Sequence, residues 1–319
     1  FVGGKLYFAG HVSAGNITEF IYYVNLLTWP IASIGWVTSL VQSADASMQR
    51  LDEFLKEEPE FSNGTHMPSS FEGCIEFKKV SFIYPNSGIT ALKDVSFTIE
   101  PGGSLGILGK TGAGKSTIAA LMVRQYDPTE GSILVDGINI KDWDLSTLKS
   151  YLGWVPQEAF LFSDTIANNI AFGMDTMDID AVKSGAKAAG VHENIIGFDK
   201  QYQTKVGERG ITLSGGQKQR ISIARALIKS PKVIVLDDCL SAVDTETEEQ
   251  ILSNLNEATE NISSIIIAHR VSSVKHCQQI ICLDQGIIVE RGTSTELEAR
   301  EGHYSDLIKM QLEGHFEGS

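Results

Sequence analysis

The sequence predicts an α/β domain that follows a membrane-spanning helical segment, and three observations support this prediction. The stretch "SLGILGKTGAGKSTIAALM" reads as a short apolar strand, a glycine-rich loop and a helix with periodic apolar residues. A second apolar strand, in "KVIVLDDCLSAVDTE", ends in two adjacent carboxylates, Asp237 and Asp238. The run 20–41 contains no charged residue. The first two observations indicate the α/β domain, and the third indicates the membrane segment.

Length and composition are those of a folded protein with more than one unit. The chain has 319 residues, of which 42% are hydrophobic and 21% charged, enough for one full core and a second unit. The 26 Lys and Arg against 40 Asp and Glu give a net charge of −14, which argues against nucleic acid as a partner. The cysteines show no C-x-x-C spacing, which favours reduced core residues over a disulfide or metal role. They are Cys74, Cys239, Cys277 and Cys282.

The uncharged run 20–41 predicts a transmembrane helix. A helix of this length rises about 30 Å, enough to cross the hydrocarbon core of a bilayer. Its small and polar residues favour packing in a helical bundle, and Pro30 is expected to kink it. The alternative is a buried core helix. We assign 1–60 to the end of a membrane domain, because the pattern after position 41 stays helical but becomes charged.

The remaining domain boundaries follow from composition. The segment 61–70 contains the turn-rich "SNGTHMPSS" and predicts a linker, after which 71–319 forms the α/β domain. The first residue, Phe1, begins inside an apolar pattern, "FVGGKLYFAG". This start predicts that the chain is part of a longer polypeptide.

The glycine-rich loop predicts a nucleotide site. Gly109–Ser116 matches G-x-x-x-x-G-K-[ST] between a strand and a helix, a context in which an ordinary glycine turn is a poor alternative. Backbone N–H groups of such a loop surround phosphate oxygens, the lysine reaches the outer phosphates, and the serine hydroxyl binds Mg²⁺. We therefore expect ATP and Mg²⁺ as ligands. The predicted nucleotide-binding residues of this loop are Gly109, Lys110, Thr111, Gly112, Ala113, Gly114, Lys115, Ser116 and Thr117.

The two adjacent carboxylates predict the other half of that site. Asp237 lies at the end of a strand, where a carboxylate holds magnesium through water. Asp238 lies where a carboxylate orients the attacking water. A purely structural alternative is that Asp238 only caps the following turn.

A second glycine-rich helix start narrows the class of enzyme. Kinases of small molecules and GTPases share the first motif, but "LSGGQ" at 213–217 opens another helix with an anion-binding turn. This second turn lacks the lysine and the magnesium-binding hydroxyl of the first. It is therefore suited to closing over a nucleotide that another chain holds.

These motifs, in this order, resemble the ATP-binding cassette (ABC) family, and specifically exporters that fuse a membrane domain ahead of the ATPase. The resemblance covers nearly all of the chain and implies an α/β phosphate-loop ATPase fold with a helical insertion between Gln157 and the signature at 213–217. Further matching pieces are Tyr84 in "FIYP", Gln157 in "VPQEAFLF", "VGERG" at 206–210, "SAVD" at 241–244 and His269 in "IIIAHR".

The resemblance also implies roles for individual residues. Tyr84 would stack on adenine, Gln157 would sense magnesium and signal to the membrane domain, and His269 would contact the γ-phosphate. In a head-to-tail dimer, Ser214 and Gly216 would reach the γ-phosphate bound by the partner's loop. The implied catalytic residues are Asp238, His269 and Gln157, the metal-binding residues are Ser116, Gln157 and Asp237, and the nucleotide-binding signature residues are Ser214, Gly215, Gly216 and Gln217.

Asp238 departs from the pattern of the family, in which glutamate usually follows the magnesium-binding aspartate. Aspartate is shorter by one C–C bond, about 1.5 Å, and misplacement by about 1 Å can cost on the order of 100-fold in rate. The departure resembles one chain of the heterodimeric exporters, with a slow site of its own and an intact signature for the partner's site. A homodimer in which Asp238 is an adequate base is the alternative.

The expected location is a cell membrane, inner or plasma, with the ATPase domain in the cytoplasm. An alternative function of a different class is that of a soluble cassette ATPase that acts on DNA or ribosomes. The first sixty residues would then form an interaction helix. The uncharged run 20–41 argues against it. The exported substrate is not readable, because the helices that would bind it are not in this sequence.

Overall fold

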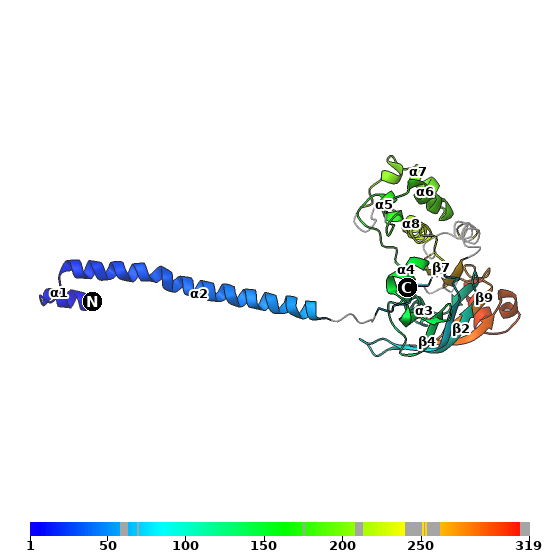
Figure 1. Ribbon diagram of the computed structural model, residues 1–319, viewed down its shortest axis with the longest axis horizontal. Coiled ribbons are helices and arrows are strands. Elements are labelled where there is room, and N and C mark those ends of the chain that lie inside the picture. The colour runs from blue at the N-terminus through cyan, green and yellow to red at the C-terminus, as the bar shows by residue number, and fades with distance from the viewer. Residues whose placement is uncertain are drawn as a thin grey trace. The chain divides into compact units, whose positions relative to one another are not determined.

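Two compact units make up the chain, Phe1–Phe61 and Ser62–Ser319. The computed structural model describes residues 1–57, 63–68, 70–174, 176–207, 213–239, 251, 253 and 262–312. The first unit is helical, whereas the second contains two β-sheets and the helices that pack on them (Figure 1).

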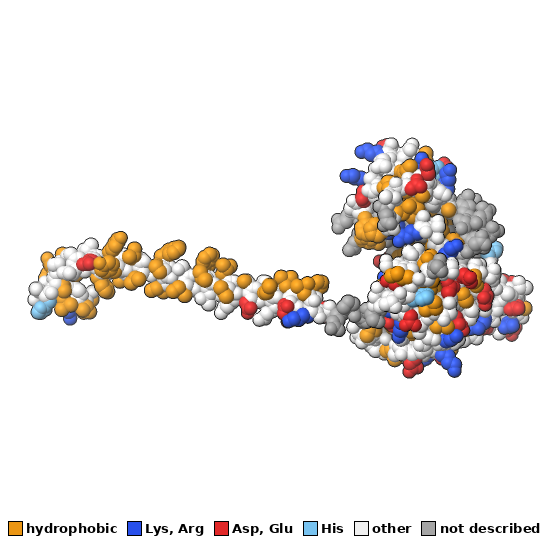
Figure 2. Space-filling model, in the orientation of Figure 1, with side chains coloured by type: hydrophobic (Ala, Val, Ile, Leu, Met, Phe, Trp, Pro, Cys, Tyr) orange, Lys and Arg blue, Asp and Glu red, His pale blue; other side chains and the backbone are white. Residues whose placement is uncertain are grey.

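The first unit consists of α1 (Val2–Phe8) and the long helix α2 (Ala14–Lys56). Ser13 caps α2, since its hydroxyl accepts from the backbone N–H of Asn16. None of the 43 residues of α2 is buried, and its apolar side chains are exposed along its length (Figure 2). Its most apolar window has a mean hydropathy of 1.4, so by length and composition α2 can cross a membrane. The helix runs through Pro30 and past position 41, as the charged extension predicts.

Polar side chains within the uncharged run bond to the backbone of their own helix. Asn25 donates to the carbonyl of Ile21 at 3.0 Å, and Thr28 donates to that of Val24 at 2.8 Å. Thr38 bonds the carbonyl four residues before it in the same way. These hydrogen bonds satisfy side-chain donors within the helix. The packing of this helix in a bundle stays a prediction.

The second unit begins with an antiparallel sheet whose strand order is β2-β1-β4-β5. Along β1 the residues Ile75, Phe77, Val80 and Phe82 are buried and the polar residues between them are partly or fully exposed, as expected for a strand with one face on a core. Phe77 of β1 and Phe97 of β2 face each other and their rings stack at 4.4 Å. The strands are β1 (Ile75–Ile83), β2 (Thr90–Ile99), β4 (Glu130–Val135) and β5 (Ile138–Asn139).

The other sheet has six strands in the order β10-β9-β3-β8-β7-β6. All neighbours are parallel except β10 and β9. Every residue of β7 is buried, which is typical of a parallel strand covered on both faces. The strands are β3 (Ser104–Leu108), β6 (Leu152–Val155), β7 (Val233–Asp237), β8 (Ser263–Ile267), β9 (Gln279–Asp284) and β10 (Ile287–Gly292).

Helix α3 (Lys115–Met122) belongs to the core that joins the two sheets. One hydrophobic cluster contains buried residues of α3 together with residues of both sheets, among them Ile75, Ile118 and Val235. Seven of the eight residues of α3 are buried. The helix that follows the glycine-rich loop is therefore held in place by packing with residues of both sheets.

A separate group of helices forms the predicted insertion after Gln157. Helices α5–α8 share a second hydrophobic cluster with Val155 of β6 and Leu236 of β7 (Figure 1). The helices before the signature confirm the expected helical insertion. They are α5 (Ile166–Ile170), α6 (Ile179–Ala188) and α7 (His192–Ile196), followed by α8 (Gly215–Leu227); α4 (Leu145–Tyr151) precedes β6.

The C-terminal helices α10 (Ser294–Glu298) and α11 (His303–Leu312) pack on a third cluster, which includes Cys277 and Cys282. Burial raises the pKa of both thiols to about 12, so they stay protonated and unreactive. Cys239, Cys277 and Cys282 are buried, as expected of core residues, whereas Cys74 is partly exposed.

The described part of the expected linker bonds to the second unit. Asn63 donates to the carboxylate of Asp144 at 2.9 Å, and its side-chain oxygen accepts from the N–H of Leu145 at 2.8 Å. The N–H of His66 donates to the carbonyl of Asp142 at 3.0 Å. Residues 63–66 are therefore attached to the α/β unit at the start of α4.

Candidate functional site

The glycine-rich loop connects β3 to α3, and two of its glycines have conformations that other residues avoid. Gly112 and Gly114 have φ values of 80° and 100°. A Cβ at Gly114 would lie 2.5 Å from the carbonyl oxygen of Ala91. Gly114 therefore has to be glycine for the chain to turn into the helix at Lys115.

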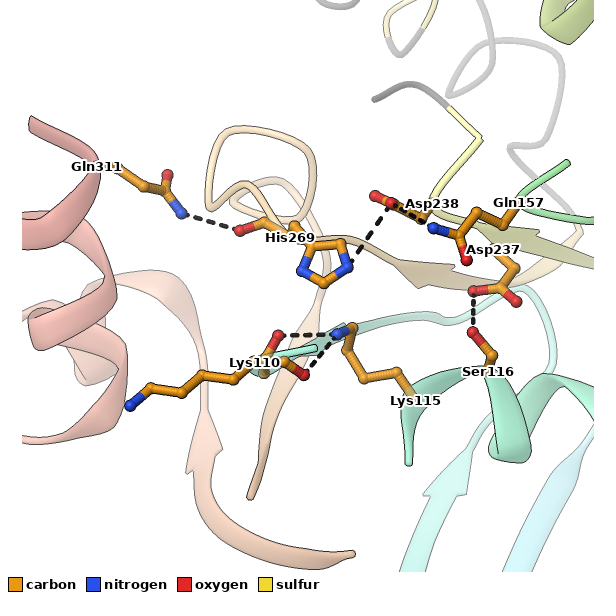
Figure 3. Close-up of polar contacts among 9 residues, drawn as sticks. Lys110, Lys115, Ser116, Gln157, Asp237, Asp238, His269 and Gln311 are labelled. Carbon is orange, nitrogen blue, oxygen red and sulfur yellow. Dashed lines mark hydrogen bonds and ion pairs between the residues drawn. The ribbon is translucent and has the colours of Figure 1, made fainter. Parts of the chain in front are cut away.

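Lys115, the first residue of α3, is buried with 6% of its surface exposed. Its Nζ donates to the carbonyl oxygens of Gly109 at 2.8 Å and Lys110 at 3.0 Å, so the ammonium group lies across the loop (Figure 3). Burial lowers the pKa of Lys115, while the charges of Asp238 and Asp237 oppose this shift. The loop thus holds a buried cation at the start of a helix, where an anion binds favourably.

Ser116 and Asp237 form the pair that the sequence assigns to the metal. The Ser116 hydroxyl donates to Oδ1 of Asp237 at 3.0 Å. Burial raises the pKa of Asp237, and the Ser116 hydrogen bond opposes this. Among the described residues, no group of three or more His, Cys, Asp or Glu side chains could hold a metal. One hydroxyl and one carboxylate fit Mg²⁺, which prefers oxygen ligands and keeps waters and phosphate oxygens in its coordination shell.

Asp238 follows β7 in a left-handed conformation with φ of 45°, which aspartate tolerates better than most residues. Its backbone N–H donates to the carbonyl of Ile267 at 2.9 Å. Its Oδ2 accepts from Nε2 of Gln157 at 3.4 Å and lies 3.7 Å from Nε2 of His269 (Figure 3). Burial raises the pKa of Asp238, against the opposing effects of His269 and Lys115. The carboxylate is therefore shielded and faces two polar side chains from other strands.

His269 lies two residues beyond β8 and directs its ring toward Asp238 (Figure 3). Burial lowers the pKa of His269 and Lys115 lowers it further, while Asp238 raises it. The imidazole is therefore neutral at pH 7. Its backbone carbonyl accepts from Nε2 of Gln311 in α11 at 3.0 Å. Sequence reasoning missed Gln311, because no motif marks it.

The sheet order explains why these residues meet. Strands β3, β8, β7 and β6 are consecutive parallel neighbours, so their carboxyl ends lie at one edge of the sheet. The register pairs Ile107 and Asp237 with the same residue, Ile267, and pairs Val155 with Leu236. The phosphate loop, the two carboxylates, the histidine and Gln157 each follow one of these strands. This edge is where open α/β sheets bind their ligands.

Tyr84 lies beside the first turn of α3. Its hydroxyl is 3.0 Å from Oγ1 of Thr117, and its ring packs edge-on against Phe82 and Tyr126. The residue is half-buried. Its place next to the phosphate loop is compatible with the predicted adenine contact, which stays a prediction.

The signature residues occupy the start of α8, in the helical group rather than at the sheet edge (Figure 1). The hydroxyl of Ser214 accepts from the N–H of Gln217 at 3.2 Å, and Oε1 of Gln217 accepts from the N–H of Ser214 at 3.0 Å. Ser214 and Gly215 are exposed, and Gly216 is partly exposed. Of "VGERG" only 206–207 are described, and "SAVD" at 241–244 lies outside the described residues.

Comparison with known proteins finds similarity to ABC transporters. A family profile described as ABC transporter matches residues 92–241. The chain is 39% identical over 310 residues to the probable multidrug resistance ABC transporter ATP-binding/permease protein YheI of Bacillus subtilis. It is 40% identical over 312 residues to the ATP-dependent lipid A-core flippase of Pseudomonas putida. Each of these matches covers 97% of this chain, and 53% and 51% of those proteins respectively.

A solved structure is similar over nearly the whole chain. The structure of a bacterial Atm1-family ABC exporter with ATP bound matches with a TM-score of 0.83 and 36% identity. The match covers 95% of this chain and 53% of that one. The chain thus spans about half the length of the relatives it matches.

Proposed function

Because the chain carries the ATPase domain of the ABC transporter family, we propose that it binds and hydrolyses ATP with Mg²⁺ and couples this reaction to export across a membrane. The observation that carries the proposal is the convergence of Lys115, the Ser116–Asp237 pair and Asp238 at one sheet edge. The similar exporter structure contains bound ATP, which supports the choice of nucleotide.

Each group of the site has a role in the proposed reaction. The loop N–H groups and Lys115 bind the phosphates, while Ser116 and Asp237 hold the metal. Mg²⁺, when bound, neutralises charge on the transferring phosphoryl group. Asp238 orients the attacking water and accepts its proton, and burial favours this by raising the pKa of the carboxyl toward neutrality. Gln157 donates a hydrogen bond to that carboxylate, and the His269 ring lies beside it.

Opening and closing of a dimer would link the reaction to transport. The exposed start of α8 carries Ser214 and Gly216 away from the phosphate loop of its own chain. In a head-to-tail dimer these residues complete the partner's site. ATP then favours the closed dimer because its γ-phosphate is bound by both halves only in that state.

We further propose that the site formed by Asp238 is slow and that the partner is a different ABC half-transporter. Its carboxylate is about 1.5 Å shorter in reach than that of glutamate, and it is already engaged by Gln157 and His269. Placement of the water is therefore less favourable than with glutamate. The chain's own signature would complete a fast site on the partner.

Helix α2 is proposed to span the membrane, with the ATPase domain in the cytoplasm. Its complete exposure and apolar surface support a lipid environment over a buried core helix. Recovery of the protein in the membrane fraction, released by detergent and not by high salt, is the expected result. Release by salt alone would favour the soluble cassette ATPase. The exported substrate remains open among the classes that the relatives' names include, drugs and lipids.

The decisive experiment compares ATP hydrolysis by the chain in nanodiscs with that of Asp238→Glu, using Lys115→Ala for the background. We expect a slow rate that rises at least about tenfold with Glu, because the longer side chain restores the reach to the water. Such a rise would direct the search to a partner subunit. A brisk rate that Asp238→Glu leaves unchanged would exclude the slow-site proposal and favour a homodimer.

A further inference from the structure

Helix α11 contacts the nucleotide site through one side chain, Gln311. Its Nε2 donates to the carbonyl of His269 at 3.0 Å (Figure 3). Its Oε1 accepts from the N–H of Val271 at 3.1 Å. Both polar ends of the amide are used, one as donor and one as acceptor. These opposite requirements fix the orientation of the amide and mark a specific contact.

The segment that Gln311 holds lies beyond the end of β8. Ala268 still bonds to the sheet, since its N–H donates to the carbonyl of Ile107 at 3.1 Å. From His269 onward the chain leaves the ladder, and its backbone groups need partners from elsewhere. Gln311 supplies a partner for two of these groups, the carbonyl of His269 and the N–H of Val271. The backbone that carries the His269 ring is thus attached to α11.

Helix α11 is itself firmly anchored at its first turn. The backbone N–H groups of His303 and Tyr304 donate to the two carboxylate oxygens of Glu290 in β10, at 2.9 and 2.8 Å. The Tyr304 ring is fully buried, and its hydroxyl is 2.9 Å from that of Ser294. A side chain in the last turn of such a helix is carried by a rigid element, as precise positioning requires.

The same helix borders the phosphate loop. A cavity of about 130 Å³ lies between them, lined on one side by Gly109 and Lys110 and on the other by Leu307 and Met310. Helix α11 therefore adjoins both the loop and the His269 segment, and a hydrogen-bonded contact on it can influence both. Gln311 and His269 are 42 residues apart in the sequence.

We propose that Gln311 is a positioning residue for ATP hydrolysis, holding the 269–271 backbone so that the His269 imidazole faces Asp238. This inference rests on the proposed function. It assigns Gln311 no contact with nucleotide; the residue acts through His269, whose Nε2 lies 3.7 Å from Asp238.

The test replaces the amide with an apolar side chain of similar length, Gln311→Met, which keeps helix propensity and removes both hydrogen bonds. Lys309→Ala, an exposed position on the same helix, is the matched control. In nanodiscs we expect kcat to fall about tenfold with Gln311→Met, because His269 is displaced, while KM for ATP changes less than about twofold. Lys309→Ala should keep both constants.

Two further measurements separate positioning from general destabilisation. In the nucleotide-free protein, hydrogen exchange at the Val271 amide should be faster in Gln311→Met, with no change at Ala268. In a His269→Ala background, Gln311→Met should cause no further loss of kcat, since the residue acts through that ring.

The inference would be overturned if Gln311→Met kept the wild-type kcat or the wild-type exchange rate at Val271. It would also be overturned if the double variant with His269→Ala had a lower kcat than His269→Ala alone. If the wild type hydrolyses no ATP above Lys115→Ala, the proposed function fails. Exchange at Val271 then still decides whether Gln311 holds this segment.

Discussion

Helices α3 and α8 both begin in a glycine-rich turn, but their first turns are built differently. At α3, Lys115 is buried, and Ser116 donates to Asp237 from a neighbouring strand. At α8, Ser214 and Gln217 bond to each other in a capping box at an exposed helix start. One helix start is surrounded by charged groups of its own chain, whereas the other is complete as a helix cap and open to solvent.

This difference shows that two similar sequence motifs can have different structural roles. Both helix N-termini favour anions. At α3 a buried lysine and a hydroxyl paired with a carboxylate are added. Under the proposed function these groups bind nucleotide and Mg²⁺, whereas α8 would offer an additional set of donors. This division supports the proposed dimer, in which the start of α8 covers nucleotide held by the partner.

The largest expected effect is at α3. Lys115→Ala should lower ATP hydrolysis at least about 100-fold, because a buried cation aimed at the phosphates is lost. Phosphate release measures the rate. Lys78→Ala, which removes an exposed lysine of β1, serves as control and should retain wild-type activity. If Lys115→Ala kept more than a tenth of the activity, the assignment of the α3 loop as the nucleotide site would be wrong.

A smaller effect is expected at α8, where Ser214→Ala removes the capping hydroxyl. The loss of the cap should lower the free energy of unfolding by about 1 kcal/mol. Thr293→Ala provides a matched comparison, because Thr293 caps α10 in the same way with Glu296. Denaturant titration should give similar losses for both variants.

Activity then distinguishes the two caps. In the assembled transporter, only Ser214→Ala should lower ATP hydrolysis, by about tenfold, since the hydroxyl also serves the partner's nucleotide. Equal activity of the two variants would indicate that Ser214 acts as a helix cap alone, and the comparison with α3 would lose its functional meaning.

The smallest effect concerns the stability cost of the charged groups near α3. Burial raises the pKa of Asp238 in the folded protein above its value in the unfolded chain. The folded state is therefore more stable when this carboxyl is protonated, and this part of the free energy of unfolding is lost as the pH rises through the raised pKa. Asp238→Asn should therefore increase the free energy of unfolding at pH 7 by about 1 kcal/mol in the absence of nucleotide. The gain should shrink as the pH falls toward about 4.

Denaturant unfolding at both pH values measures this difference, with the exposed Asp199→Asn as control. A variant less stable than the wild type at pH 7 would mean that the attraction of Asp238 to Lys115 and its hydrogen bond from Gln157 outweigh the cost of its burial. The corresponding stabilisation is not expected from any uncharged replacement at α8, where Ser214 is exposed.

Prediction from sequence worked best where the signal is local. The phosphate loop, Lys115 and Ser116 follow from one strand–loop–helix pattern, and Gly114 is constrained by its own backbone conformation. The long apolar helix α2 was also visible in the sequence. Composition does not display the local bonding of the polar residues in that helix, where Asn25 and Thr28 bond to their own backbone.

The sequence by itself determined the local elements: a glycine-rich loop at the start of α3, a strand followed directly by Asp238, and one long apolar helix. Only the tertiary structure decided which side chains meet. Gln157 reaches Asp238 across 81 residues of sequence, and Gln311 reaches His269 across 42. The reason is that the order β3-β8-β7-β6 differs from the order along the chain, and long-range strand pairing depends on the packing of the whole sheet rather than on any local pattern of residues.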